Sequence, residues 1–461
     1  MPLKDDGAAP ALDTGARLIV KTLDYGAQVI QRPSKATLRD TRAHNERLVL
    51  STLYEVGAAS RAHVARLTGL TRTTVSDVVT ALLKAGLVRE IGRGPSSRGK
   101  APILLEVPAG ARYVVGVDLG ESVFRGAVVN LDGEMVRVAE VPAGDSNGDR
   151  ALERVFQLLD RLLTSAARPV LGIGIGAPGL IDTTDGTVMQ AVNIEWRGVP
   201  LGDLVSARWG LPVYVVNDSQ VAALAEYSFG AVRRSNLVAI KVSGGIGAGL
   251  VLNGTLFQGD GPGAGEIGHM IVVRDGLPCQ CGRRGCLQTV ASTRAVLARI
   301  GAVRGTPPPT LEEAVAAFER GDAIVGDIVL EAARYLGTDV AGIVATLSAH
   351  HVVLVGTMPL FGQRWLDAVR AQMFEDALPS LLRDVTIELG QADDIVIVGS
   401  AALLVQRELG LSLRLKADQR GAARPTVSPG SPVRRAGGAE RRLDKGYPSG
   451  TATPTFGETP A

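Results

Sequence analysis

The apolar positions along the chain change their period near residue 113, and the two parts predict different structures. Over residues 44–56 the apolar side chains recur at the three- and four-residue spacing of a helix, and Gly57 is placed to end it. Two shorter helical patterns follow, opened by the capping residues Ser60 and Thr71. The residues predicted to form their shared core are Val64, Leu67, Leu70, Val75, Val78, Val79 and Leu82.

A β-hairpin is predicted after the last of these helices. Residues 87–94 and 103–107 have the composition of strands, and the segment 95–102 between them combines Pro, Gly and Ser with basic residues. A helix, a tight turn, a capped helix with a polar first turn and a basic hairpin, in this order, predict a winged helix-turn-helix over residues 36–107 that binds double-stranded DNA. The alternative is a small helical docking domain with a charged surface.

The distribution of charge supports the DNA-binding interpretation. Residues 36–107 carry eleven Lys/Arg against six Asp/Glu, whereas the whole chain has a formal net charge of only +2. A basic module ahead of a near-neutral remainder is typical of a nucleic-acid reader joined to another function. Basic and short hydroxyl side chains meet phosphates and base edges. The candidate DNA-binding residues are Arg61, Thr71, Arg72, Thr73, Thr74, Ser76, Arg93, Arg98 and Lys100.

From residue 113 onward, short apolar strands separated by glycine-rich turns predict an α/β fold. The strand at 170–175 is followed by residues 176–179 (GAPG), and the strand at 213–216 is followed by Asn217 and Asp218. Because α/β folds place ligand sites at strand ends, these residues are candidate ligand contacts. The other predicted strands are 114–119, 123–131, 237–242, 249–252 and 352–355.

The cysteines indicate a metal site. All three cysteines of the chain lie within residues 279–286, and a histidine precedes the first of them by ten positions. One imidazole and three thiolates complete a tetrahedral structural zinc site and leave no position for a reactive water. The alternatives are three buried thiols without a metal and, less favoured, a disulfide framework. The predicted zinc ligands are His269, Cys279, Cys281 and Cys286.

The odd number of cysteines and the lack of an apolar signal segment in residues 1–25 predict a reduced, cytoplasmic protein. No run approaches the 18 apolar residues of a membrane helix, so no membrane association is expected.

Several motifs, in their order along the chain, resemble the ROK family (repressor, open reading frame, kinase), in its winged-helix repressor branch, over about residues 40–405. The resemblance implies two actin-like (ribonuclease H-like) α/β lobes of the sugar-kinase type around a sugar cleft, with a zinc loop. The motifs that carry it, after the winged module, are 114–120 (VVGVDLG), 174–179 (GIGAPG), 217–218 (ND), 265–269 (GEIGH) and 279–286 (CQCGRRGC).

This fold implies a domain organisation for the rest of the chain. A first lobe is expected over residues 108–222, completed by about 393–410, and a second lobe over 223–392 with the zinc loop and an oligomerisation surface. Residues 1–35 have no sustained period, and residues 411–461 are rich in Pro, Gly, Ser, Thr and Arg, so both ends are expected to be disordered.

The resemblance also implies which residues hold a sugar. They are Asn217, Asp218, Glu266 and His269, with Gly179 beside them, and Gln288 stands where family members have a glutamate. Loss of that charge suggests a ligand different from the commonest one in the family. In the family's kinases the counterpart of Asp218 is the general base that takes the proton of the attacking sugar hydroxyl.

The motifs that hold phosphates in the kinases are changed in this chain. A Gly-Thr pair is replaced by Glu121 and Ser122, which puts a carboxylate where phosphate oxygens would approach. Gly244 replaces a threonine, and residues 356–359 (GTMP) stand where the kinases have Gly-Gly. The sequence therefore predicts that ATP use and catalysis are lost.

Together these patterns predict a sugar-responsive DNA-binding transcriptional regulator, a repressor of carbohydrate-metabolism genes, with a sugar or sugar derivative bound between the lobes. Paired operator half-sites require at least a dimer, so a homodimer or homotetramer is expected. The first alternative is an ATP-dependent sugar kinase with an attached DNA-binding module. The second is a structural protein stabilised by zinc that binds no ligand. The presence of Asn217, Asp218 and Glu266 argues against this alternative.

Overall fold

The structure of the chain is a computed structural model that describes residues 38–95, 101–144, 147–164, 169–230, 235–390 and 394–413. The predicted disordered segment 1–35, residues 414–461 of the predicted tail, and the hairpin residues Arg98 and Lys100 lie outside the described residues. The chain divides into two units, 1–417 and 418–461, and every described residue belongs to the first unit.

Three helices and a three-stranded antiparallel sheet make up the amino-terminal module. The sheet has the order β1-β3-β2, so the two arms of the predicted hairpin pair with each other and the short β1 adds to the second arm. Its elements are α1 (Leu38–Val56), β1 (Ala59–Ser60), α2 (Arg61–Thr68), α3 (Arg72–Lys84), β2 (Arg89–Arg93) and β3 (Ile103–Glu106).

Both predicted caps of this module are confirmed. The hydroxyls of Ser60 and Thr71 each accept a hydrogen bond from the backbone N–H three residues later. The prediction that Leu67 belongs to the core is wrong, because its side chain is 52% exposed. Helix α2 buries the face formed by Val64 and Ala65, and Leu67 lies on the flank of that face.

The first α/β lobe is built on a five-stranded sheet of order β11-β7-β4-β5-β6. Strands β4, β7 and β11 are parallel, and their registers pair Asp118 with Gly176 and Ala177 with Asn217. The carboxyl ends of these strands therefore meet at one edge of the sheet, where the candidate ligand residues lie. The strands are β4 (Tyr113–Leu119), β5 (Val123–Asn130), β6 (Met135–Pro142), β7 (Val170–Ala177) and β11 (Val213–Asn217).

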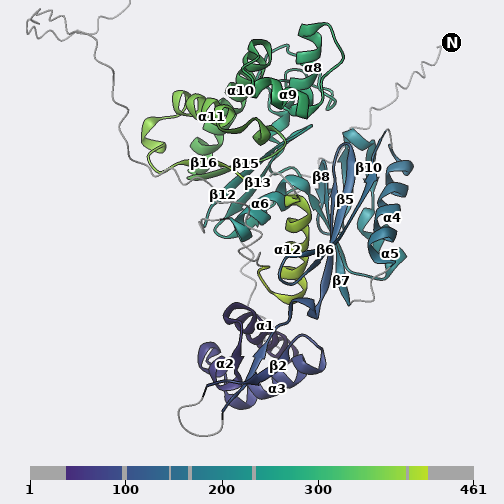
Figure 1. Ribbon diagram of the computed structural model, residues 1–461, viewed down its shortest axis with the longest axis vertical. Helices are drawn as coiled ribbons and strands as arrows, with labels where there is room; N and C mark the ends of the chain where they lie inside the picture. The colour runs from purple at the N-terminus through teal and green to yellow at the C-terminus, as the bar shows by residue number, and fades with distance from the viewer. Residues whose placement is uncertain are drawn as a thin grey trace, which may run out of the picture. The chain divides into compact units, whose positions relative to one another are not determined.

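Helix α4 covers one face of this sheet, and α12 covers the other (Figure 1). A small antiparallel sheet of order β10-β9-β8 follows β7 in the chain. The further elements of this lobe are α4 (Asp149–Leu163), β8 (Leu180–Asp182), β9 (Thr187–Ala191), β10 (Trp196–Val199), α5 (Leu201–Trp209) and α12 (Ile395–Leu409).

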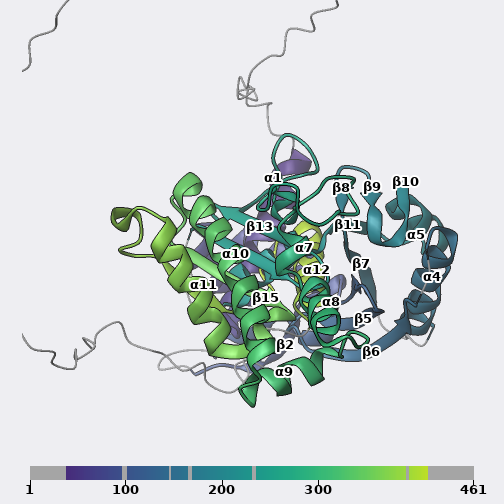
Figure 2. The same cartoon turned by 90° about the horizontal axis from the view of Figure 1, so that it is seen from above.

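The second α/β lobe has a five-stranded sheet of order β14-β13-β12-β15-β16. Its long helices α10 and α11 pack on each other and, in Figure 2, lie over β15. The strands are β12 (Leu237–Val242), β13 (Ile246–Leu252), β14 (Thr255–Phe257), β15 (His351–Gly356) and β16 (Thr386–Leu389), and the helices are α6 (Asp218–Phe229), α7 (Gln288–Ala291), α8 (Thr293–Arg304), α9 (Leu311–Glu319), α10 (Ala323–Leu347) and α11 (Gly362–Asp376).

The two faces of β12 belong to different cores. Val238 and Ile240 pack in the core that contains α10 and α11, whereas Leu237 and Ala239 pack in the core that contains α6 and α12. Side chains alternate along a strand, so Lys241 falls on the face toward α6. This places one charged residue of an otherwise apolar strand beside the first turn of α6, which begins at Asp218.

Helices α6 and α12 pack against each other; α6 also contacts β12 and β13, and α12 contacts β4 and β7. Glycines in the first sheet allow this close packing. A Cβ atom on Gly116 would collide with the backbone of α12 at Ile397, and a Cβ atom on Gly174 would collide with it at Ser400. The helix pair therefore joins the two sheets into one packed unit.

The segment after α12 does not leave the folded part at residue 411, where the disordered tail was predicted to begin. Leu411 and Leu413 are both 1% exposed and share a core with Val49 and Leu53 of α1. Burial of these two side chains offsets the entropy cost of ordering the backbone that carries them. None of the described helices is long and apolar enough to cross a membrane.

Candidate functional site

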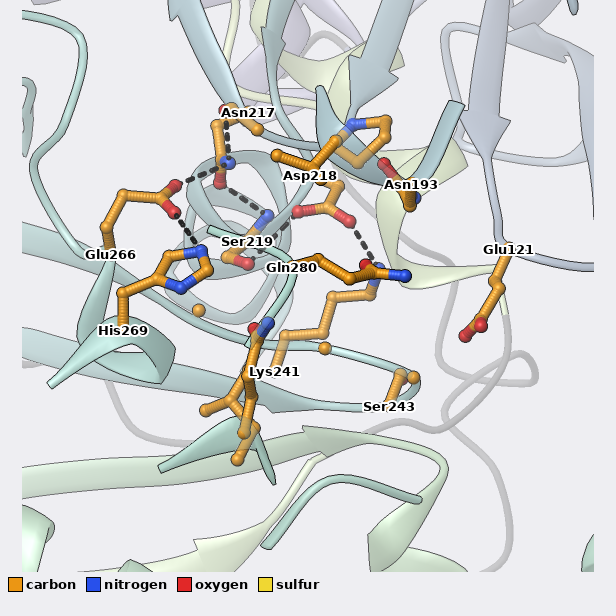
Figure 3. A pocket seen from close by; sticks show the side chains of 18 of the residues that line it. Glu121, Asn193, Asn217, Asp218, Ser219, Lys241, Ser243, Glu266, His269 and Gln280 are labelled. Atoms are coloured by element: carbon orange, nitrogen blue, oxygen red, sulfur yellow. Dashed lines mark hydrogen bonds and ion pairs between the residues drawn. The ribbon is translucent and has the colours of Figure 1, made fainter. Parts of the chain in front are cut away.

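A cavity of about 500 Å³ lies at the shared edge of β4, β7 and β11, opposite the β12–β13 turn and the loop that precedes α7. In Figure 3 Glu266 and His269 stand on one side of it and Glu121 on the other, with Asp218 between them. Every residue that the sequence predicted to hold a sugar lines this cavity: Gly179, Asn217, Asp218, Glu266, His269 and Gln288.

Asn217 uses its amide to hold the site together. Its Oδ1 accepts hydrogen bonds from the backbone N–H groups of the first turn of α6, at 2.9 and 3.2 Å. Its Nδ2 donates to the carbonyl of Gly179 at 3.0 Å and reaches Oε1 of Glu266 at 3.5 Å. Asn217 is therefore a helix cap that also ties together the residues around the cavity.

Gly179 is the one position here where the backbone requires glycine. Its φ is +85°, and a Cβ atom would collide with the carbonyl of Gln190. Without a side chain, the loop after β7 can approach the small β8–β10 sheet closely. This approach aims the Gly179 carbonyl at Asn217, so the glycine shapes the cavity through its backbone.

Asp218, the first residue of α6, forms a nearly buried ion pair with Lys241. Lys241 Nζ lies 2.6 Å from Oδ2, and the two side chains are 15% and 16% exposed. Burial disfavours the charged form of Lys241, but the carboxylates of Asp218 and Asp118 raise its pKa to about 12. The other oxygen, Oδ1, accepts a hydrogen bond from the Ser219 hydroxyl at 3.1 Å.

Glu266 and His269 lie on the opposite side of the cavity from Glu121 (Figure 3). Oε2 of Glu266 lies 3.8 Å from Nε2 of His269. Burial, together with the nearby Asp218, raises the pKa of Glu266 to about 7. Burial also lowers the pKa of His269, which favours the neutral imidazole that a metal requires.

The four predicted metal ligands come together. The ligand atoms of His269, Cys279, Cys281 and Cys286 all lie within 4.8 Å of one another. His269 Nδ1 is 3.6 Å from Cys279 Sγ, and the Cys281 and Cys286 sulfurs are 3.7 Å apart. Ligand atoms around one tetrahedral zinc lie about 3.5–3.8 Å apart, given Zn–S bonds of about 2.3 Å. The cluster therefore fits a single metal ion bound by Nδ1, with Nε2 turned toward Glu266.

Gln288 belongs to the metal cluster as much as to the cavity. Its side-chain amide Nε2 donates to Cys279 Sγ at 3.3 Å. A glutamate at this position could not donate to a thiolate, whereas glutamine can. Gln288 therefore links the cavity wall to a predicted metal ligand.

Glu121 lies on the other side of the cavity, in the turn between β4 and β5. Its carboxylate forms an ion pair with Arg294 of α8, and both side chains are 42% exposed. The carboxylate also fills the space next to Gly244, where an added Cβ atom would collide with it. Glu121 and Gly244, which the sequence analysis singled out separately, are therefore neighbours in the structure.

Residues 357–359 do not line the cavity. Thr357 forms a hydroxyl pair with Thr293 at 2.7 Å, and its backbone N–H donates to the carbonyl of Val242 at 3.0 Å. Met358 is fully buried. This segment packs the start of α8 against the end of β12.

The candidate DNA-binding residues of the amino-terminal module divide into two groups. Arg72 and Thr73 are exposed at the start of α3, and Arg93 is exposed at the end of β2. Ser76 is half-buried one turn further along α3. Three candidate side chains, Arg72, Thr73 and Arg93, are therefore available to a partner.

Three further candidates that the structure describes are engaged within the module. Arg61 pairs with Glu90 of β2 at 3.1 Å. The hydroxyls of Thr71 and Thr74 lie 2.8 Å apart at the cap of α3. We therefore expect these three residues to position α3 and the hairpin.

Sequence reasoning missed several residues that line the cavity. Lys241 was detectable, because it is the single charged residue of an apolar strand. The others come from loops and helix starts without a local signal: Asn193, Gln280, Arg283 and Arg294.

Comparisons with known proteins agree with this geometry. Residues 114–407 match the model of the ROK family. The chain belongs to the ROK family. It is 32% identical over 380 residues to a protein named "Putative xylose repressor" from Caldicellulosiruptor sp. (strain Rt8B.4), an alignment that covers 78% of this chain and 95% of that protein.

Two solved structures extend the comparison. A ROK family transcriptional regulator, described as a homolog of the E. coli MLC protein, matches with a TM-score of 0.69 and 26% identity over 80% of this chain and 96% of that one. A ROK family glucokinase from Streptomyces griseus, in complex with glucose and AMPPNP, matches with a TM-score of 0.57 and 28% identity over 63% of this chain and 98% of that one. The two lobes therefore have the actin-like fold of ROK kinases.

Proposed function

We propose that this ROK protein is a sugar-responsive transcriptional repressor in the cytoplasm. The observation that carries the proposal is the difference between the two sides of one cavity. Glu266 and His269 on one side, with Asp218 beside them, would offer polar groups to sugar hydroxyls, while the Glu121 carboxylate on the other side would repel a nucleotide phosphate. The relative named a xylose repressor aligns with 78% of the chain, which includes more than the two lobes.

The amino-terminal module is proposed to be a winged helix-turn-helix that reads operator DNA. Helix α3 would enter the major groove with Arg72 and Thr73 at its exposed start, and Arg93 of the hairpin would contact the backbone. Arg98 and Lys100 extend the same basic hairpin in the sequence. A homodimer or homotetramer would present two such modules to paired half-sites.

The His/Cys cluster is proposed to hold a structural zinc ion. His269, Cys279, Cys281 and Cys286 fill all four positions of a tetrahedral site, so the ion would hold the loop and leave no position for catalysis. His269 would bind the metal through Nδ1 and face Glu266 through Nε2. The metal would in this way orient one wall of the sugar site.

DNA binding can be tested without a known operator. Purified protein selects duplexes from a random-sequence library, and fluorescence anisotropy then measures the affinity for the selected sequence. We expect Arg72→Ala to weaken binding by about 5- to 150-fold, the range of one good base contact. Arg42→Ala, at an exposed position of α1, is the matched control and should stay within about twofold. No selected sequence, or equal loss in both variants, contradicts the proposal.

The effector can be identified by a thermal-shift screen of monosaccharides, amino sugars and their phosphates. A ligand at 100 times its Kd stabilises the folded protein by about 2.7 kcal/mol. The stabilising sugar is then tested for its effect on DNA affinity. An effector should change that affinity, in either direction, and a sugar that binds without any such change contradicts the regulatory role.

The alternative function is a sugar kinase, favoured by the retained Asp218 and by the likeness to the glucokinase structure. It requires a bound triphosphate, because phosphoryl transfer depends on positioning and charge neutralisation around the phosphates. Purified protein with Mg-ATP and the stabilising sugar should release no ADP above background. Steady turnover that Asp218→Asn abolishes would establish the kinase instead.

A further inference from the structure

Two ion pairs lie among the residues that line the cavity. We call the part that they form the phosphate side (Glu121, Lys241, Gly244 and Arg294), because the resemblance to ROK kinases implies that a nucleotide would lie there. Lys241 of β12 pairs with Asp218 at the start of α6, and Glu121 of the β4–β5 turn pairs with Arg294 of α8. The second pair joins the two lobes directly. Asp218 is also a predicted sugar contact, whereas Lys241, Glu121 and Arg294 belong neither to the predicted sugar contacts nor to the metal cluster.

Lys241 is the cation of a small group of carboxylates. Its ammonium lies 2.6 Å from Asp218 Oδ2, and the charges of Asp218 and Asp118 both stabilise its protonated form. Asp118 Oδ1 is buried and has no hydrogen-bond partner within the described part of the chain. Two carboxylates at the strand edge of a phosphoryl-transfer fold are a usual place for a divalent cation, which neutralises them and the phosphates together. Here an amino-acid side chain carries that positive charge.

Glu121 supplies the opposite charge. Its carboxylate lies next to Gly244, so a side chain at position 244 would have to displace the end of the Glu121 side chain. A phosphate group in this place would need the space that the carboxylate fills and the cation that it already pairs with, Arg294. The carboxylate and the glycine therefore fit each other, and together they close this side to an anion.

We propose that Lys241 and Glu121 are built-in replacements for the divalent cation and the phosphate of a metal–nucleotide complex, which makes them the residues that restrict this cavity to a sugar alone. This deepens the proposed function and rests on it. A cavity that carries its own counter-ions keeps its two lobes paired across the phosphate side without a nucleotide. The effector then acts on a site whose charges are already neutralised.

The cation part is tested with Mn²⁺ alone, added to the full chain with its metal cluster loaded, and free Mn²⁺ is followed by electron paramagnetic resonance. Lys241→Met should bind one Mn²⁺ per chain at least tenfold more tightly than the wild type. Lys241→Met combined with Asp118→Asn should lose this gain. Arg299→Met removes an exposed ion pair of α8 outside the cavity and is the matched control.

The anion part is tested with inorganic pyrophosphate alone, by isothermal titration calorimetry. Glu121→Gly frees Arg294 and the space over Gly244, so it should bind pyrophosphate at least tenfold more tightly than the wild type. Glu331→Gly frees Arg299, which lies on α8 as Arg294 does, and this variant should show no gain in pyrophosphate affinity. Because this arm leaves the buried pair intact, it decides the proposal even if Lys241→Met fails to fold.

The absence of a gain in a folded variant of either arm overturns the proposal. So does wild-type protein that already binds Mn²⁺ with an affinity that Asp118→Asn abolishes. Neither arm uses sugar or DNA, so failure here is distinct from failure of the repressor function, which the operator and effector measurements decide.

Discussion

The two sides of the cavity differ in how their polar groups are held. On the sugar side, Glu266 and His269 are fixed by a helix cap and by the metal cluster, and their remaining hydrogen-bonding capacity faces the cavity. On the phosphate side, Lys241 and Glu121 are each bonded to an opposite charge. We infer that a cavity can bind a ligand where its polar groups keep free hydrogen-bonding capacity. It is closed to a ligand where those groups are paired with each other.

The broadest expected effect, on metal content and sugar affinity together, comes from breaking the support of the sugar side. Cys281→Ser should reduce bound metal from one ion per chain to nearly none, and sugar affinity should fall by about 10- to 100-fold, because the metal orients His269. Metal analysis and sugar titration on the same sample measure both. Chelation of wild-type protein should reproduce the loss and added zinc should reverse it. A metal-free variant with normal sugar affinity would show that the two sites are independent.

A pH-dependent effect is expected from Asp118, whose charge acts on Lys241. Burial raises the pKa of Asp118 to about 6, from about 3.9 in the unfolded chain. Between these values the folded protein binds more protons than the unfolded chain, so the free energy of unfolding falls as the pH rises. Asp118→Asn removes the free-energy cost of burying a charged carboxylate. Its gain over the wild type should be about 1–3 kcal/mol at pH 8 and near zero at pH 4.

Urea unfolding of both proteins at several pH values between 4 and 8 measures this difference. A gain that does not change with pH would mean that Asp118 stays charged in the folded protein across the whole range.

Asp218 belongs to both sides, so its substitution separates them. Asp218→Asn keeps the shape but weakens the acceptor offered to the sugar, and affinity should fall by about 30- to 150-fold, or 2–3 kcal/mol. DNA affinity in the absence of sugar should stay within about twofold. Calorimetry and anisotropy measure the two quantities, with exposed Asp327→Asn as the control. Equal losses of sugar affinity and DNA affinity would mean that the two kinds of binding do not belong to separate parts of the chain.

The smallest effect on stability is expected from the exposed pair. Glu121 and Arg294 are each 42% exposed, so Glu121→Gln should lower the free energy of unfolding by no more than about 1 kcal/mol. Thermal unfolding at 0.05 M and 1 M salt checks this, because screening should remove most of the difference. A larger, salt-independent loss would indicate that this pair is held away from solvent.

Much of the molecule could be predicted from the sequence because the signals were local. Each cap is set by the residues within one turn of it, so Ser60 and Thr71 cap their helices as expected. The predicted metal ligands are close in the chain, and the four ligands from His269 to Cys286 came together as expected. The residues at the ends of β7 and β11 line one cavity because parallel strands end at one edge. These relations follow from spacing and periodicity alone.

Only the tertiary structure decided which distant residues meet. The pairing of Lys241 with Asp218 depends on the face of β12 that α6 covers, and the contact of Glu121 with Arg294 depends on the approach of the two lobes. The exposure of Leu67 and the burial of Leu411 likewise depend on what packs against each segment. A side chain's periodicity shows the face on which it lies, but the partner across that face comes from another part of the chain.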